Sequence, residues 1–213
     1  MQIAVMVAGG IAEVVGWWLV ATGRADIWKL MPVVLGAMGV AAVIARPPVA
    51  AAETSAIAAL IIGAGAGLTL YLATRAFVWT ASSHWIPFRR DVLEKYDQAG
   101  EVTLATTLVL SLAIMVPAEE LFWRGLWHAR LDDTMVSGVA ALAAWGAYVG
   151  VNLASRSLPI VAGAIVGGAV WAGLAWWTGG VLASVASHIL WTGLMLALPP
   201  GAARPAIEEG TAR

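Results

Sequence analysis

Three charged side chains, Glu119, Glu120 and Arg124, interrupt an otherwise apolar stretch that runs from about residue 103 to residue 128. An unpaired charge inside a membrane costs several kcal/mol, so each of the three needs compensation. Glu120 and Arg124 are four residues apart with the acid first, which is the favourable order for an ion pair on one helix face. Glu119 points about 100° away from Glu120 on a helix of 3.6 residues per turn. It has no partner within the helix and is placed to act as a general base.

Two further apolar stretches each carry two polar side chains four residues apart, Tyr148 with Asn152 and His188 with Thr192. This spacing puts both members of a pair on the same face of a helix. A lone histidine in a soluble core most often makes a structural hydrogen bond, but an ionisable residue inside a membrane is by default a functional candidate. Together, Glu119 and His188 predict an acid–base or oxyanion-stabilising site.

The residue types also exclude several kinds of chemistry. The chain contains no cysteine, which excludes disulfides, thiolate metal sites and a cysteine nucleophile. A zinc site normally needs three protein ligands, and only Glu119, Glu120 and His188 are available, with one carboxylate committed to Arg124. We therefore expect neither a metal nor a cofactor. The formal net charge of −1 gives no indication of a nucleic-acid partner.

Composition decides the fold class that positions these residues. Of the 213 residues, 61% are hydrophobic and 12% are charged, whereas about a quarter are charged in soluble domains. The long stretches are apolar throughout and do not alternate, which favours helices over a membrane barrel. Because a spanning helix takes about 20 residues, we predict an all-α, polytopic integral membrane protein with about seven transmembrane helices. The predicted helices cover approximately residues 3–22, 30–45, 55–79, 103–128, 135–154, 158–177 and 181–198.

A polar stretch over residues 80–100 divides the chain. It carries charged residues with aromatic residues between them, which is typical of a segment at the membrane interface. We interpret residues 1–100 as N-terminal transmembrane helices with this interfacial linker, and residues 101–198 as the helical core that carries the site. Residues 199–213 are rich in Pro, Ala and Glu, and we expect a disordered tail.

Other features of the apolar stretches are interpreted as structural. Glu13 and Arg75 each lie near a predicted helix end or within snorkelling reach of one. Gly146 and Gly150 are four residues apart, as are Gly163 and Gly167, a spacing that predicts close packing against a neighbouring helix.

Taken together, the polar motifs resemble those of the CPBP intramembrane proteases, which include the CAAX prenyl endopeptidase and the bacterial Abi proteins. The signature of that family is Glu-Glu-x-x-x-Arg, then Phe-x-x-x-His, then His-x-x-x-Asn or His-x-x-x-Asp, on successive core helices. The first motif is intact here as Glu119, Glu120 and Arg124. The resemblance covers about residues 100–198, and the motifs occur in the family's order and with its spacing.

Two positions depart from the family pattern. Tyr148 and Asn152 stand where the family has Phe and His, and His188 is followed by Thr192 where the family has Asn or Asp. An amide orients a water molecule but does not accept its proton at neutral pH. Asn152 is therefore the larger departure, because Thr192 keeps one hydroxyl donor.

The resemblance also implies roles for the matching residues. In the family, the first Glu and the second-motif His activate a water molecule, while the third motif stabilises the oxyanion. By this resemblance, Glu119 is the base, His188 is an oxyanion donor, and Glu120 with Arg124 is a supporting pair.

The resemblance implies an intramembrane endopeptidase that hydrolyses a peptide bond of a membrane-associated or C-terminal peptide. The partners are then the lipid bilayer and a membrane peptide or protein substrate, in a bacterial plasma membrane. Two other hypotheses stay open. One is a pseudoprotease that binds a membrane peptide or partner protein without cleaving it. The other is a proton-coupled carrier that uses Glu119, Arg124 and His188 as a relay, although no internal repeat of the kind found in many transporters is evident.

Overall fold

The computed structural model describes residues 1–100 and 102–200, and residues 95–100 by their backbone alone. Within this part of the chain all regular structure is helical, and six helical segments are long and apolar enough to cross a membrane. A shorter apolar helix, α10 (Leu182–Ala197), follows them. The predicted all-α membrane fold with about seven spanning helices is confirmed. The six longer segments are α1 (Gln2–Ala21), α2 (Ile27–Ala45), α3 (Ala56–His84), a composite helix (Leu104–Asp132), α8 (Ser137–Asn152) with the short η3 (Leu153–Ser155), and α9 (Leu158–Thr178).

The starts of these helices follow from capping residues in the sequence. The Asp26 side chain accepts a hydrogen bond from the backbone N–H of Trp28 at 2.7 Å at the start of α2. Ser55 caps α3 in the same way. Short polar side chains at these positions satisfy N–H groups that have no partner within the helix. At the other end of α9, Gly179 adopts a left-handed conformation with φ of 66°, the usual stop signal at a helix C-terminus.

The helix that carries the Glu-Glu-x-x-x-Arg motif is not a regular α-helix. Its short central α-helical turn, which holds Glu119 and Glu120, lies between two π-helical stretches. Such stretches are rare and occur frequently at functional sites. The composite helix consists of α5 (Leu104–Val109), the π-helical η1 (Leu110–Met115), α6 (Val116–Glu120), the π-helical η2 (Leu121–His128) and α7 (Ala129–Asp132).

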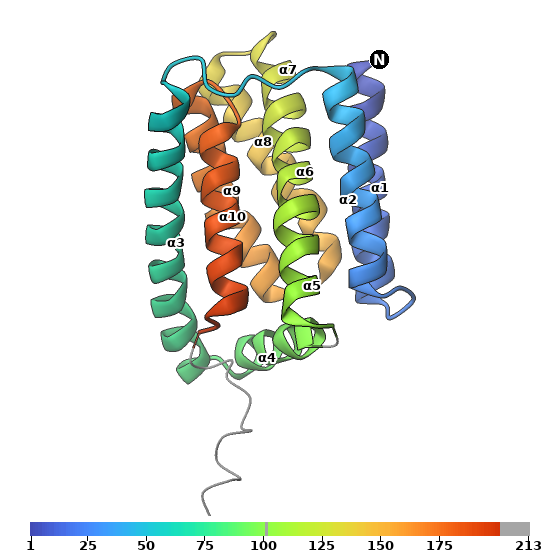
Figure 1. The fold of residues 1–213 in the computed structure, drawn as a ribbon. Coiled ribbons are helices and arrows are strands. Elements are labelled where there is room, and N and C mark those ends of the chain that lie inside the picture. Colours follow the sequence, from blue (N-terminus) through green and yellow to red (C-terminus); the bar gives the residue numbers. More distant parts are fainter. Residues whose placement is uncertain (101, 201–213) are drawn as a thin grey trace, which may run out of the picture.

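The composite helix runs through the middle of the bundle (Figure 1), with α1 and α2 on one side and α3 and α10 on the other. Helix α4 (Ile86–Gly100) lies crosswise at the end of the bundle where α3 finishes. The predicted interfacial segment at 80–100 is thus the last turn of α3 followed by α4. Phe88 and Val92 of α4 are buried against Val78 of α3, so this helix is packed onto the bundle. The tail predicted to be disordered at 199–213 lies almost wholly outside the described residues.

Glycines allow close contacts between helices, but the closest of these are not at the predicted positions. A Cβ atom at Gly39 of α2 would lie 2.7 Å from Cα of Ala118 in α6. A Cβ atom at Gly67 of α3 would lie 2.6 Å from the carbonyl oxygen of Ser187 in α10. At Gly146 and Gly150 a Cβ would meet nothing within 4 Å, so the prediction of close packing there is wrong. At Gly163 a Cβ would lie 3.5 Å from the Trp191 ring of α10, an ordinary contact, and at Gly167 it would meet Trp171 of its own helix. Gly39 and Gly67 thus allow α2 and α3 to pack closely against the two helices that carry Glu119 and His188.

Candidate active site

The predicted ion pair is present in the interior of the bundle. Nη1 of Arg124 donates to Oε1 of Glu120 at 3.1 Å, and both side chains are buried. Nη2 of Arg124 donates to the carbonyl oxygen of Gly168 on α9 at 3.1 Å. The guanidinium carbon lies 4.7 Å from the centre of the Tyr148 ring, within the range of a cation–π interaction. Arg124 therefore joins the motif helix to α8 and α9.

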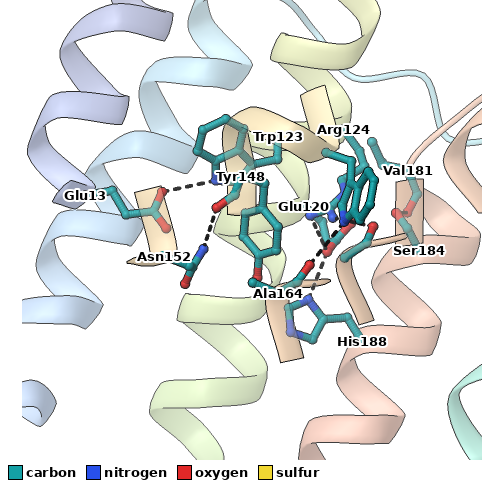
Figure 2. A network of polar contacts seen from close by, with 12 residues as sticks. Glu13, Glu120, Trp123, Arg124, Tyr148, Asn152, Ala164, Val181, Ser184 and His188 are labelled. Atoms are coloured by element: carbon teal, nitrogen blue, oxygen red, sulfur yellow. Dashed lines mark hydrogen bonds and ion pairs between the residues drawn. The ribbon is translucent and has the colours of Figure 1, made fainter. Parts of the chain in front are cut away.

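A third residue, His188, is bonded to the ion pair of Glu120 and Arg124. Nδ1 of His188 lies 2.9 Å from the same Oε1 atom of Glu120 that Arg124 contacts (Figure 2). An ionised carboxylate only accepts hydrogen bonds, so Nδ1 of His188 carries the proton and donates it. The imidazole also stacks on the Trp171 ring, with ring centroids 3.5 Å apart. These contacts hold the imidazole in one orientation and leave Nε2 for other partners.

Glu119 differs from the adjacent Glu120 in its contacts and in its access to a cavity. Its side chain is 8% exposed and lines a cavity. Among the described residues it makes no hydrogen bond and no ion pair, whereas Glu120 is held by Arg124 and His188. The sequence predicted a carboxylate without an in-helix partner at this position, and the geometry agrees with that prediction.

The cavity has a volume of about 530 Å³ and brings together polar residues from three helices. Its polar lining includes Glu119 from α6, Tyr148 and Asn152 from α8, and His188 and Thr192 from α10. Glu120 and Arg124 are not among its lining residues and lie behind them. Most of the remaining wall is apolar, contributed by the second half of α3, by α4, by the start of α9 and by the end of α10. A cavity with a few convergent polar groups in an apolar wall is the usual form of a site for an apolar or amphipathic ligand.

Asn152 is committed to its own helix. Its Nδ2 donates to the carbonyl oxygen of Tyr148 at 2.9 Å, and the side chain is 2% exposed. The amide oxygen is then the group that remains for a bound water. Thr192 lies one turn beyond His188 on the same wall of the cavity.

The structure corrects the interpretation of Glu13. This residue does not lie near a helix end or within snorkelling reach of one. It is in the interior of α1 and 0% exposed. Its Oε2 accepts a hydrogen bond from Nε1 of Trp123 at 3.1 Å (Figure 2). The sequence contained one signal for this, a carboxylate in the middle of an apolar stretch, but it did not show which helix packs against α1.

The expectation that no metal is needed stays a prediction. In the part of the chain that the structure describes, no group of three or more His, Asp or Glu side chains is arranged to hold a metal ion. Glu120 and His188, two of the three donors considered from the sequence, are bonded to each other.

The fold and the site together define an integral membrane protein with a buried acid–base cluster beside an apolar cavity. Residues 101–194 match the family model described as "Type II CAAX prenyl endopeptidase Rce1-like". This part of the chain holds all the motifs described above, and the match supports its membership of the CPBP intramembrane protease family. No curated protein and no solved structure matches the chain.

Proposed function

We propose that the protein is an intramembrane endopeptidase in which Glu119 activates a water molecule to hydrolyse a peptide bond. The substrate is a membrane-associated or C-terminal peptide whose apolar part occupies the cavity. The observation that carries the proposal is the contrast between the two adjacent carboxylates. Glu120 is neutralised by Arg124 and bonded to His188, whereas Glu119 faces the cavity without a hydrogen-bond partner among the described residues.

The reaction follows from this arrangement. Glu119 takes a proton from a water molecule in the cavity, and the water oxygen attacks the carbonyl carbon of the peptide bond. The negative charge that develops on the carbonyl oxygen is stabilised by donors in the wall, for which His188 and Thr192 are placed. Glu119 then returns the proton to the leaving nitrogen as the carbon–nitrogen bond breaks.

For His188 to donate to the oxyanion, Nε2 must carry a proton. Because Nδ1 already donates to Glu120, the ring must then be an imidazolium. The Glu120 carboxylate stabilises that cation directly. The link between Glu120 and His188 is thus part of the proposed mechanism as well as of the fold.

The experiment is cleavage of a set of membrane peptides by the purified protein, with products identified by mass. The Glu119→Gln variant keeps the size of the side chain and removes the base, and we expect a loss of about 10²-fold or more in kcat. Glu53→Gln is the matched control because Glu53 is exposed in the loop between α2 and α3, outside the cavity. Cleavage that survives Glu119→Gln would remove the glutamate mechanism. A peptide that binds to wild-type protein but is never cut would favour the pseudoprotease.

A further inference from the structure

The carboxylate of Glu13 is the one buried acidic group of the site region that the proposed mechanism does not use. Its side chain is 0% exposed, and its two oxygens have different surroundings. Oε2 accepts the hydrogen bond of Trp123, whereas Oε1 is buried without a hydrogen-bond partner among the described residues. Trp17, one turn further along α1, also has a buried indole N–H with no such partner, and this residue lines the cavity. A buried carboxylate with a free oxygen needs either a proton or a cation.

Glu13 meets the face of the motif helix that carries Glu119. Trp123, which donates to Glu13, lies four residues after Glu119, a spacing that puts their side chains on the same helix face. Helix α1 packs against η2 and α8, which brings Glu13 close to the motif helix. Glu13 is not among the residues that line the cavity, so its carboxyl group lies outside the space open to a substrate.

The charges in this region do not balance if every carboxyl group is ionised. Glu13, Glu119 and Glu120 would then carry three negative charges. At most two positive charges oppose them, the guanidinium of Arg124 and the protonated ring of His188, and both are bonded to Glu120. Arg124 is already bonded to Glu120 at 3.1 Å. The other titratable groups nearby are Tyr148 on α8, which interacts with the same carboxylates, and His188 on α10, which is bonded to Glu120. No cation within bonding distance is left for Glu13 or Glu119 among the described residues.

We propose that Glu13 and Glu119 share one proton, so that Glu13 is a positioning residue that holds this proton while Glu119 acts as the base. Two neighbouring carboxyl groups in an apolar interior retain one proton between them, because the like charges oppose the second ionisation. With the proton on Glu13, Glu119 is the carboxylate that takes the proton of the attacking water and passes it to the leaving nitrogen. The role of Glu13 in catalysis rests on the proposed function, whereas the sharing of a proton does not.

The first test needs no substrate. Infrared spectroscopy of the purified protein follows protonated carboxyl groups as the pH is raised, in wild type, Glu13→Gln and Glu119→Gln. The wild-type pair should lose its last proton at a raised pH, because the second ionisation places two like charges together. In each single variant the remaining carboxyl group should lose its proton at a pH lower by about one unit or more. Surviving groups that titrate at the wild-type pH in both variants would overturn the shared proton, as would a wild type with no protonated core carboxyl at neutral pH.

The second test measures how kcat of peptide cleavage depends on pH. Glutamine at position 13 still accepts the Trp123 hydrogen bond, so Glu13→Gln should leave KM unchanged. It should move the acid limb of the profile to higher pH by about one unit, because no shared proton then stabilises the Glu119 carboxylate. Glu13→Asp, which keeps the carboxylate, should restore the wild-type limb. Met6→Leu, a change of similar volume in the buried face of α1, controls for repacking. An unmoved limb in Glu13→Gln would show that Glu13 is purely structural. Infrared shifts in a protein that cleaves nothing would instead reject the proposed function and keep the shared proton.

Discussion

Nδ1 of His188 and Oε1 of Glu120 are 2.9 Å apart although 68 residues separate them in sequence. This contact fixes the tautomer of the neutral ring, because the carboxylate accepts and the imidazole nitrogen must donate. It also connects α10 to the motif helix at the level of Glu119. The arrangement resembles an orienting carboxylate behind a catalytic imidazole, in which the carboxylate holds the ring and stabilises its charged form.

The first prediction concerns the alkaline side of the pH profile. If His188 donates to the oxyanion as an imidazolium, kcat should fall as the pH rises and the ring loses its Nε2 proton. His188→Gln should remove this alkaline limb and lower kcat by about 10²- to 10³-fold, the usual loss for one oxyanion donor. The measurement is kcat of peptide cleavage across pH for both proteins. An alkaline limb that persists unchanged in His188→Gln would assign it to another group.

The second prediction concerns the stability of the buried pair. Arg124→Met should destabilise the protein by about 3 to 5 kcal/mol, because it leaves the buried Glu120 carboxylate without its guanidinium counter-charge. The double variant Glu120→Gln with Arg124→Met removes the stranded charge and should be more stable than the single variant. Thermal unfolding of the detergent-purified proteins measures both effects. A double variant less stable than Arg124→Met would mean that the remaining contacts of Glu120 outweigh the ion pair.

Much of the helix pattern was predictable because it depends on local properties. Apolar length predicted the spanning segments, and the four-residue spacing of Glu120 and Arg124 predicted their ion pair. The same spacing on α8 and α10 predicted that Tyr148 and Asn152, and likewise His188 and Thr192, share a wall. Each of these relations lies within one helix, where the residue period fixes which side chains are neighbours.

Relations between helices were not predictable from this one sequence. Nothing in α1 indicates that Glu13 meets Trp123, because that depends on how the helices pack. The same holds for the bond between Glu120 and His188. The glycine spacing was a poor guide as well, since Gly146 and Gly150 have no close neighbour while Gly39 and Gly67 do. The π-helical stretches on either side of α6 have no signal in the pattern of apolar residues.

The third prediction concerns α4, which contributes Phe88 and Val92 to the cavity wall. Oδ2 of Asp91 accepts a hydrogen bond from the backbone N–H of Leu158 at 2.6 Å, where Ser157 provides no side-chain cap for α9. Asp91→Ala should therefore loosen both α4 and the start of α9, at a cost of about 1 kcal/mol, the typical value of a helix cap.

Hydrogen–deuterium exchange by mass spectrometry measures this effect. We expect faster exchange in Asp91→Ala at the first turn of α9 and along α4, with Asp91→Asn close to wild type because an amide oxygen still accepts the hydrogen bond. Exchange that increases equally throughout the bundle would indicate a global loss of stability and no specific link between α4 and α9.

The last prediction concerns Asn152, which stands where the CPBP motif has a histidine. Its amide donates to the carbonyl oxygen of Tyr148 at 2.9 Å and cannot take a proton from water at neutral pH. If Glu119 serves as the base without help from this position, wild-type protein should still cleave its substrate, and Asn152→His should raise kcat by up to about 10²- to 10⁴-fold. Glu119→Gln in that background should abolish cleavage. Asn152→Gln is the control, because it changes the size of the side chain without adding a titratable group. The measurement is product formation by mass for wild type and the three variants with one peptide. An equal rise in Asn152→Gln and Asn152→His would mean that the shape of the cavity, and not proton transfer, limits the rate.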